Sequence, residues 1–140
     1  MAEYTNIALQ TVAAGQNVVF TETPVCGGRY ITHREGSGIV ALRGITNQCR
    51  ARYKVSFGGN VAIPAGGTVA PITLAIALAG EALASATMIE TPAAAEAFSN
   101  VYAAVFVEVP QGCCLNVAVE NAGADPIDVQ NANLIVERVA

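Results

Sequence analysis

Bulky apolar and polar residues alternate along most of this chain. Between positions 49 and 57, an apolar residue occupies every second position, and basic residues or serine occupy the positions between them. This alternation predicts a β-strand with one buried face and one solvated face. The solvated face of this strand is basic, with Arg50, Arg52 and Lys54.

The segment 72–79 is apolar on both faces, but the two faces differ in size. Isoleucine and leucine alternate with smaller residues, among them Ala75, Ala77 and Ala79. The bulky face suits the core of a β-sandwich, and the alanine face allows close approach of another layer or subunit. We therefore expect Ala75, Ala77 and Ala79 to contribute to a subunit interface.

Other short apolar segments follow the same period and are separated by turn residues. We expect further strands at 7–12, 18–21, 30–32, 39–42, 82–89, 101–109, 115–119 and 133–139. Tight turns are expected at Gly80-Glu81 and at Pro110-Gln111-Gly112, and a helical turn in the alanine-rich segment 91–99. About ten short antiparallel strands in one domain, residues 1–140, indicate a sandwich or barrel.

The composition indicates more apolar surface than one small domain can bury. Apolar residues make up 53% of the chain and charged residues 13%, against about 45–50% and about 25% in typical domains. A membrane span, aggregation or a subunit interface would account for the excess. Glycines and prolines interrupt the longest uncharged segment, 55–80, so we expect no membrane span.

The first six residues are polar and lack the pattern of a signal peptide. We therefore expect the protein to be made and kept in the cytosol, unless an unusual export route or lysis releases it. Of the three explanations for the apolar excess, the subunit interface is the one that we retain.

Charge is distributed unevenly. The net charge of −4 argues against general nucleic-acid binding. Six of the seven Lys and Arg residues lie between positions 29 and 54, whereas eight acidic residues and one Arg follow from position 81. The strand face of Arg50, Arg52 and Lys54 is therefore a candidate docking surface for an acidic partner or a neighbouring subunit. The alternative is an ordinary solvated strand face.

No set of residues indicates catalysis, a cofactor or a bound metal. A single histidine, His33, cannot supply a jelly-roll metal site, and we expect it to be a solvated loop residue. The chain has four cysteines, Cys26, Cys49, Cys113 and Cys114, and they lack metal-binding spacing. We expect them to be small buried residues in a reducing compartment. A Cys26–Cys49 disulfide is the alternative.

The C-terminal third resembles a known superfamily. One pattern is similar to the strand–turn–strand segment of tumour necrosis factor and complement-type globular heads. It consists of Tyr102, nine residues, Gly112, two residues and then Leu115. The final segment 133–140 and the opening segment 15–20 are similar to bacterial spore-surface heads and phage structural proteins of the same superfamily.

The resemblance implies a ten-strand jelly roll that packs as a compact homotrimer. It places Tyr102 where an aromatic residue faces the three-fold axis, with Ala104 and Phe106 on the same strand face. An ordinary tyrosine on a sheet surface is the alternative. The chain departs from the family in lacking Trp and in carrying Cys113-Cys114 where polar residues are common. Receptor binding of the cytokine kind therefore does not carry over.

These observations predict a non-enzymatic structural protein that assembles as a homotrimer. We expect a phage virion component, such as a capsid decoration or a head or fibre protein, that contacts other virion proteins. The alternative is an adhesion or ligand-binding head on a spore or cell surface. A third hypothesis, an enzyme on the same scaffold, requires His33 to lie in one pocket with a cysteine and an acid.

Overall fold

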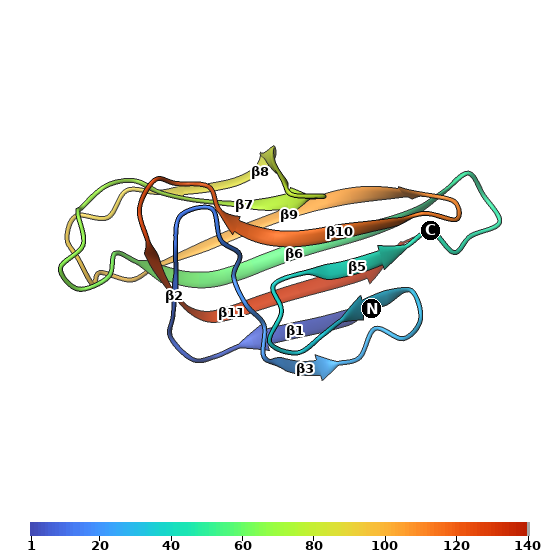
Figure 1. Cartoon of the computed structure of the whole chain (residues 1–140), viewed down its shortest axis with the longest axis horizontal. Helices are drawn as coiled ribbons and strands as arrows, with labels where there is room; N and C mark the ends of the chain where they lie inside the picture. The colour runs from blue at the N-terminus through green and yellow to red at the C-terminus, as the bar shows by residue number, and fades with distance from the viewer. Residues whose placement is uncertain (140) are drawn as a thin grey trace.

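Two antiparallel sheets stack face to face in the computed structural model, which describes residues 1–139 (Figure 1). The first sheet has the order β3-β1-β11-β6-β9, and β2 also pairs with β11. The second sheet has the order β4-β5-β10-β7-β8. The strands are β1 (Ala2–Asn6), β2 (Gln10–Val12), β3 (Glu22–Val25), β4 (Ile31–His33), β5 (Val40–Arg43), β6 (Arg50–Ala62), β7 (Ile72–Leu78), β8 (Glu81–Glu90), β9 (Ser99–Pro110), β10 (Cys114–Asn121) and β11 (Ile127–Arg138).

The all-β jelly-roll sandwich predicted from the sequence is confirmed. Strand β6 shows why the period of two was informative, because its inward residues are completely buried, whereas Arg50 and Arg52 are exposed. The inward faces of both sheets form one core that includes Tyr53, Phe57 and Leu74. No helix long and apolar enough to cross a membrane occurs among residues 1–139.

The turns between strands follow the expected chemistry. Ala79 and Gly80 both have positive φ angles, 52° and 87°, and connect β7 to β8. Positive φ at both central residues matches the twist of a hairpin. The turn Ala79-Gly80 lies one residue before the predicted turn at Gly80-Glu81. Gly112, with φ of 77°, turns the chain between β9 and β10 as expected.

The first third of the chain differs from the prediction. The polar opening segment is strand β1, because Ala2, Tyr4 and Asn6 alternate inward. The expected strand 18–21 is not formed, although Val18 and Phe20 are completely buried in the core. The backbone N–H of Val18 donates to Val119 and that of Phe20 to Ser37, so this segment inserts its side chains without joining a sheet as a strand.

The segment 91–99 contains turns and bends rather than the helical turn that its alanines suggested. Glu96 adopts a positive φ of 62°, and its N–H donates to the carbonyl of Ile63. In a helix, that N–H would donate to a carbonyl of the same segment. The hydrogen bond to Ile63 takes its place, so tertiary structure overrides the helical preference of the alanines.

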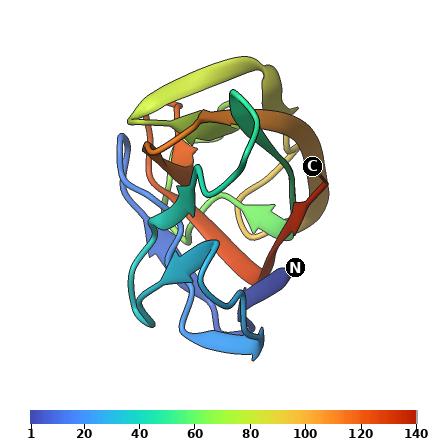
Figure 2. The ribbon, with the colours of Figure 1, turned by 90° about the vertical axis from the view of Figure 1, so that its right-hand side faces the viewer.

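Both ends of the chain lie at the same end of the sandwich (Figure 1). Figure 2 shows this end face-on, where the segment 44–49 and the turn between β9 and β10 meet. Three backbone hydrogen bonds hold these loops together: Gly44 N–H donates to Cys113, Gly112 N–H to Gly44 and Gln111 N–H to Cys49. This region is referred to below as the loop end.

Candidate assembly face and loop end

The outer face of the first sheet carries two exposed aromatic residues. Tyr102 and Phe106 lie four positions apart on the outward face of β9, and 64% and 63% of their surfaces remain exposed. Ala104 lies between them, also exposed. Exposed aromatic pairs on a small domain are candidates for an interaction surface. We refer to the outward side chains of β9, β6 and β11 as the outer face.

Small residues on β6 flatten the surface beside these rings. Gly58 is directly opposite Tyr102, and Ser56 is opposite Ala104. A Cβ atom placed on Gly58 would lie 3.7 Å from Cδ2 of Tyr102, so the ring lies close to the bare backbone of β6. The ring of Tyr102 therefore projects beside small residues, whereas Phe106 lies opposite Lys54. A neighbouring subunit can cover the surface around Tyr102 closely.

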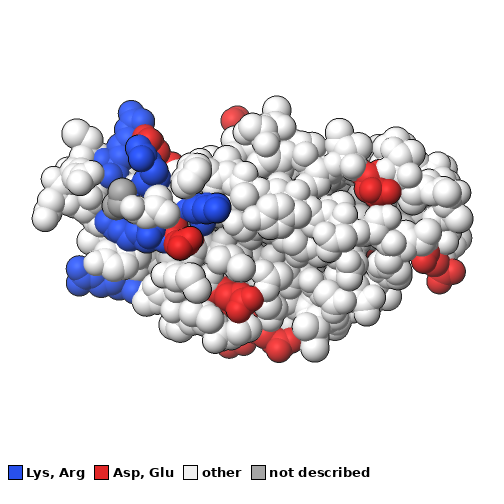
Figure 3. All heavy atoms as spheres, turned by 180° about the vertical axis from the view of Figure 1, so that it is seen from behind, with Lys and Arg blue, Asp and Glu red and all other residues white. Residues whose placement is uncertain are grey.

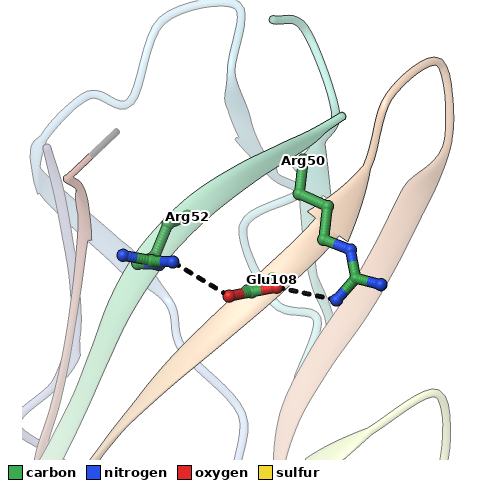
Figure 4. Close-up of polar contacts among 3 residues, drawn as sticks. All are labelled: Arg50, Arg52 and Glu108. Carbon is green, nitrogen blue, oxygen red and sulfur yellow. Dashed lines mark hydrogen bonds and ion pairs between the residues drawn. The ribbon is translucent and has the colours of Figure 1, made fainter. Parts of the chain in front are cut away.

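One carboxylate joins two arginines at the edge of the outer face. Glu108 on β9 accepts hydrogen bonds from Arg50 at 2.8 Å and from Arg52 at 3.0 Å (Figure 4). These hydrogen bonds hold the pKa of Glu108 below its usual value. All three side chains are substantially exposed. The predicted docking residues Arg50 and Arg52 are thus partly neutralised, whereas Lys54, opposite Phe106 and Glu137, makes no ion pair among the described residues.

Basic side chains gather at the loop end of the molecule (Figure 3). Arg50 and Arg52 belong to this group, and Arg29 and Arg138 approach the ring of Tyr30 there. Arg29, Tyr30 and Arg138 lie in no motif of the sequence that indicates a shared site. No local spacing indicates this cluster, because it forms only when the final strand packs beside the segment that precedes β4.

The alanine row of β7 is less exposed than the sequence suggested. Ala75 and Ala77 lie on the outward face of the second sheet, but they are 0% and 1% exposed in the single chain. Ala75 has Glu120 on one side and Thr87 on the other, and these larger side chains flank it. Ala79 is exposed but lies in the turn beyond β7. This row therefore offers a partner little area, and its role in an interface stays a prediction.

The cysteines were expected to be buried, and this expectation is wrong. All four are exposed and free, so the Cys26–Cys49 disulfide is not formed. Cys26 and Cys49 lie just outside β3 and β6, and Cys113 lies beside the turn before β10. Cys49 continues the inward alternation of β6 but precedes its first residue, and Cys114 is the first residue of β10. All four cysteines thus lie at or beyond strand ends, where the core does not cover them.

His33 was expected in a solvated loop, but it lies in β4 and is half-buried. Its ring centroid is 4.5 Å from that of Tyr4 and 6.3 Å from that of Phe20. Arg34 and Ser37 line the hollow beside it, and no cysteine or acid from the described part of the chain does so. No group of three His, Cys, Asp or Glu side chains among residues 1–139 is arranged to hold a metal ion.

Comparisons with known proteins identify the fold. No protein-family model matches the chain, and no curated protein matches it. Among solved structures, the chain is similar to the Eiger TNF of S. frugiperda, with a TM-score of 0.68, 14% identity, and coverage of 99% of this chain and 91% of the other. It is also similar to the globular domain of the zebrafish complement 1qA protein, with a TM-score of 0.64, 11% identity, and coverage of 96% and 94%.

A third similar structure is murine APRIL, with a TM-score of 0.58, 14% identity, and coverage of 97% of this chain and 98% of the other. The agreement extends over nearly the whole of each chain, while the sequences have diverged widely. The protein therefore has the jelly-roll fold of TNF- and C1q-type globular domains, as the pattern from Tyr102 to Leu115 suggested.

Proposed function

We propose that this protein is a non-enzymatic structural domain that works as a homotrimer, with the outer face of the first sheet as the subunit interface. The observation that carries the proposal is the exposure of Tyr102 and Phe106 on the same side of β9, with Gly58 and Ser56 of β6 beside Tyr102 and Ala104. The number three comes from the family resemblance around Tyr102. The fold likeness to TNF- and C1q-type domains supports the same assembly.

The two rings make a substantial contribution to such an interface but do not hold it alone. An aromatic side chain buries 150–250 Å², so the exposed two-thirds of Tyr102 and Phe106 amounts to roughly 130 Å² each. At about 25 cal/mol per Å², full burial contributes roughly 3 kcal/mol for each ring. Association costs about 4–15 kcal/mol, so the rest of the outer face must be covered as well.

Substitution of both rings tests this proposal. Light scattering coupled to size-exclusion chromatography, at micromolar concentration, is expected to give a trimer for the parent chain and smaller species for the Tyr102→Ser, Phe106→Ser double variant. The matched control is Ile89→Ser, which removes a side chain that is 68% exposed on the second sheet. A monomeric parent chain, or a double variant as trimeric as the control, would refute the proposed interface.

The particle that the trimer serves is a further part of the proposal. We propose a phage virion, with this chain as a decoration or head subunit made in the host cytosol, because the apolar excess and the family resemblance favour an assembly protein. A head domain on a spore or cell surface is the alternative. Mass spectrometry of purified phage particles tests the virion proposal. If the chain is absent from particles but present in a surface extract, the surface-head alternative is favoured.

A further inference from the structure

The loop end holds two arginines against one tyrosine ring. The Cζ atom of Arg138 lies 4.4 Å from the centroid of Tyr30, and that of Arg29 lies 5.3 Å from it. Both arginines line one hollow of about 410 Å³. This hollow lies beside the segment 44–49 and does not include Tyr102 or Phe106.

Arg138 is held in place by neutral groups. Its Nη2 donates to the carbonyl of Ile45 at 2.6 Å, and its Nη1 donates to the hydroxyl of Tyr53 at 3.4 Å. The side chain is half-buried. Neutral acceptors fix the orientation of a guanidinium but leave its positive charge uncompensated, and a half-buried charge favours a counter-ion.

The described residues provide no carboxylate for these two arginines. The ion pairs among residues 1–139 join Arg50 and Arg52 to Glu108, and neither Arg29 nor Arg138 takes part. Among residues 1–139, no acidic side chain lines the hollow. Two like charges beside one ring repel each other, so a shared anion would stabilise both.

The rest of the hollow presents neutral hydrogen-bonding groups. Thr46, Asn47 and Gln48 line it beside the arginines. The hydroxyl of Thr46 accepts a hydrogen bond from the N–H of Gln48, which shapes the turn, while Asn47 and Gln48 are exposed. Side-chain amides of this kind donate to and accept from hydroxyl groups. The volume lies within the range of small-molecule sites.

We infer that this hollow, formed by Arg29, Arg138, Tyr30 and the segment 46–48, binds a sugar-sized ligand that bears a carboxylate, such as a uronic acid. The two guanidinium groups bind the carboxylate, since their planar N–H groups match its two oxygens. The amides of Asn47 and Gln48 bind ring hydroxyls. The site is independent of the proposed trimer, because it uses none of the outer-face aromatic residues.

The experiment is a titration of the ¹⁵N-labelled chain with glucuronate, followed by amide NMR shifts. Glucuronate is expected to shift the amides of residues 45–48 and of Tyr30, whereas glucose at the same concentration leaves them unchanged. Arg29→Gln is expected to weaken binding about tenfold, which corresponds to about 1.4 kcal/mol. The matched control is Arg34→Gln, which removes the same charge from an exposed residue outside the hollow and is expected to change the affinity less than about twofold.

A second variant tests the role of the fixed guanidinium. Arg138→Lys keeps the charge but removes the planar group, and it is expected to weaken binding about fivefold. Its melting temperature is measured alongside, and Arg29→Gln keeps the test valid if Arg138→Lys does not fold. No shift with roughly 10 mM glucuronate, about tenfold above a Kd of about 1 mM, would overturn the inference. Equal loss in Arg34→Gln and Arg29→Gln, equal shifts with glucose, or equal affinity for acetate would overturn it too.

Discussion

Asn121 is a buried amide whose removal has a calculable effect on stability. It lies at the end of β10 and is 0% exposed. Its Nδ2 donates to the carbonyls of Val12 at 3.1 Å and Asp125 at 2.9 Å, and its Oδ1 accepts from the N–H of Gly123 at 3.1 Å. One side chain thus ties β2 to the loop that precedes β11.

Asn121→Ala removes all three hydrogen bonds and leaves three backbone groups without these partners. Each such bond contributes about 1 kcal/mol net, so the free energy of unfolding is expected to fall by about 3 kcal/mol. Domains of this kind are stabilised by about 5–15 kcal/mol in total. The loss is therefore large enough to measure accurately.

Urea unfolding followed by circular dichroism measures the change, with all variants at one protein concentration because assembly adds to apparent stability. With an m value of about 2 kcal/mol/M, the midpoint is expected to fall by about 1.5 M. Asn121→Asp is expected to be at least as destabilising, because a carboxylate cannot donate to the two carbonyls. The matched control is Asn116→Ala on the same strand, where the side chain is exposed and the expected change is within about 0.5 kcal/mol. A loss below that limit in Asn121→Ala would refute the reasoning.

Two further predictions concern the loop end. Gly44→Ala is expected to destabilise the chain by about 1–3 kcal/mol, because the new Cβ would lie 2.0 Å from the carbonyl oxygen of Pro110. Thermal unfolding measures this loss. The control is Gly58→Ala, whose Cβ meets nothing closer than 3.7 Å. Glu108→Gln removes a carboxylate whose pKa is held below its usual 4.5 by hydrogen bonds from Arg50 and Arg52. Its stability contribution is present above pH 4.5 and is lost as the pH falls through the depressed pKa, so the melting temperatures of parent and Glu108→Gln are expected to differ at neutral pH and to converge in acid. Curves that stay equally separated in acid would contradict this.

The segments with clear alternation were predictable because a strand has only two faces. Between positions 49 and 57, the charged residues could lie only in solvent, so burial of Tyr53 and Phe57 and exposure of Arg50 followed from the pattern. The turn at Gly112 was equally local, since positive φ there favours glycine. The opening strand was missed because β1 alternates polar residues with Ala2 and Tyr4, and its inward Asn6 gives no apolar signal.

The period of the sequence by itself determined that the chain is an all-β sandwich and which side chains of its long strands face the core. Only the tertiary structure decided which outward residues stay exposed, because exposure depends on neighbours in the sheet. Ala75 is buried beside Glu120, whereas Tyr102 remains exposed beside Gly58. It also decided the arrangement of the loop-end hollow, in which Arg138 donates to the carbonyl of Ile45 across 93 positions of sequence. Local spacing carries no information over such a distance, since only the pairing of the strands brings those residues together.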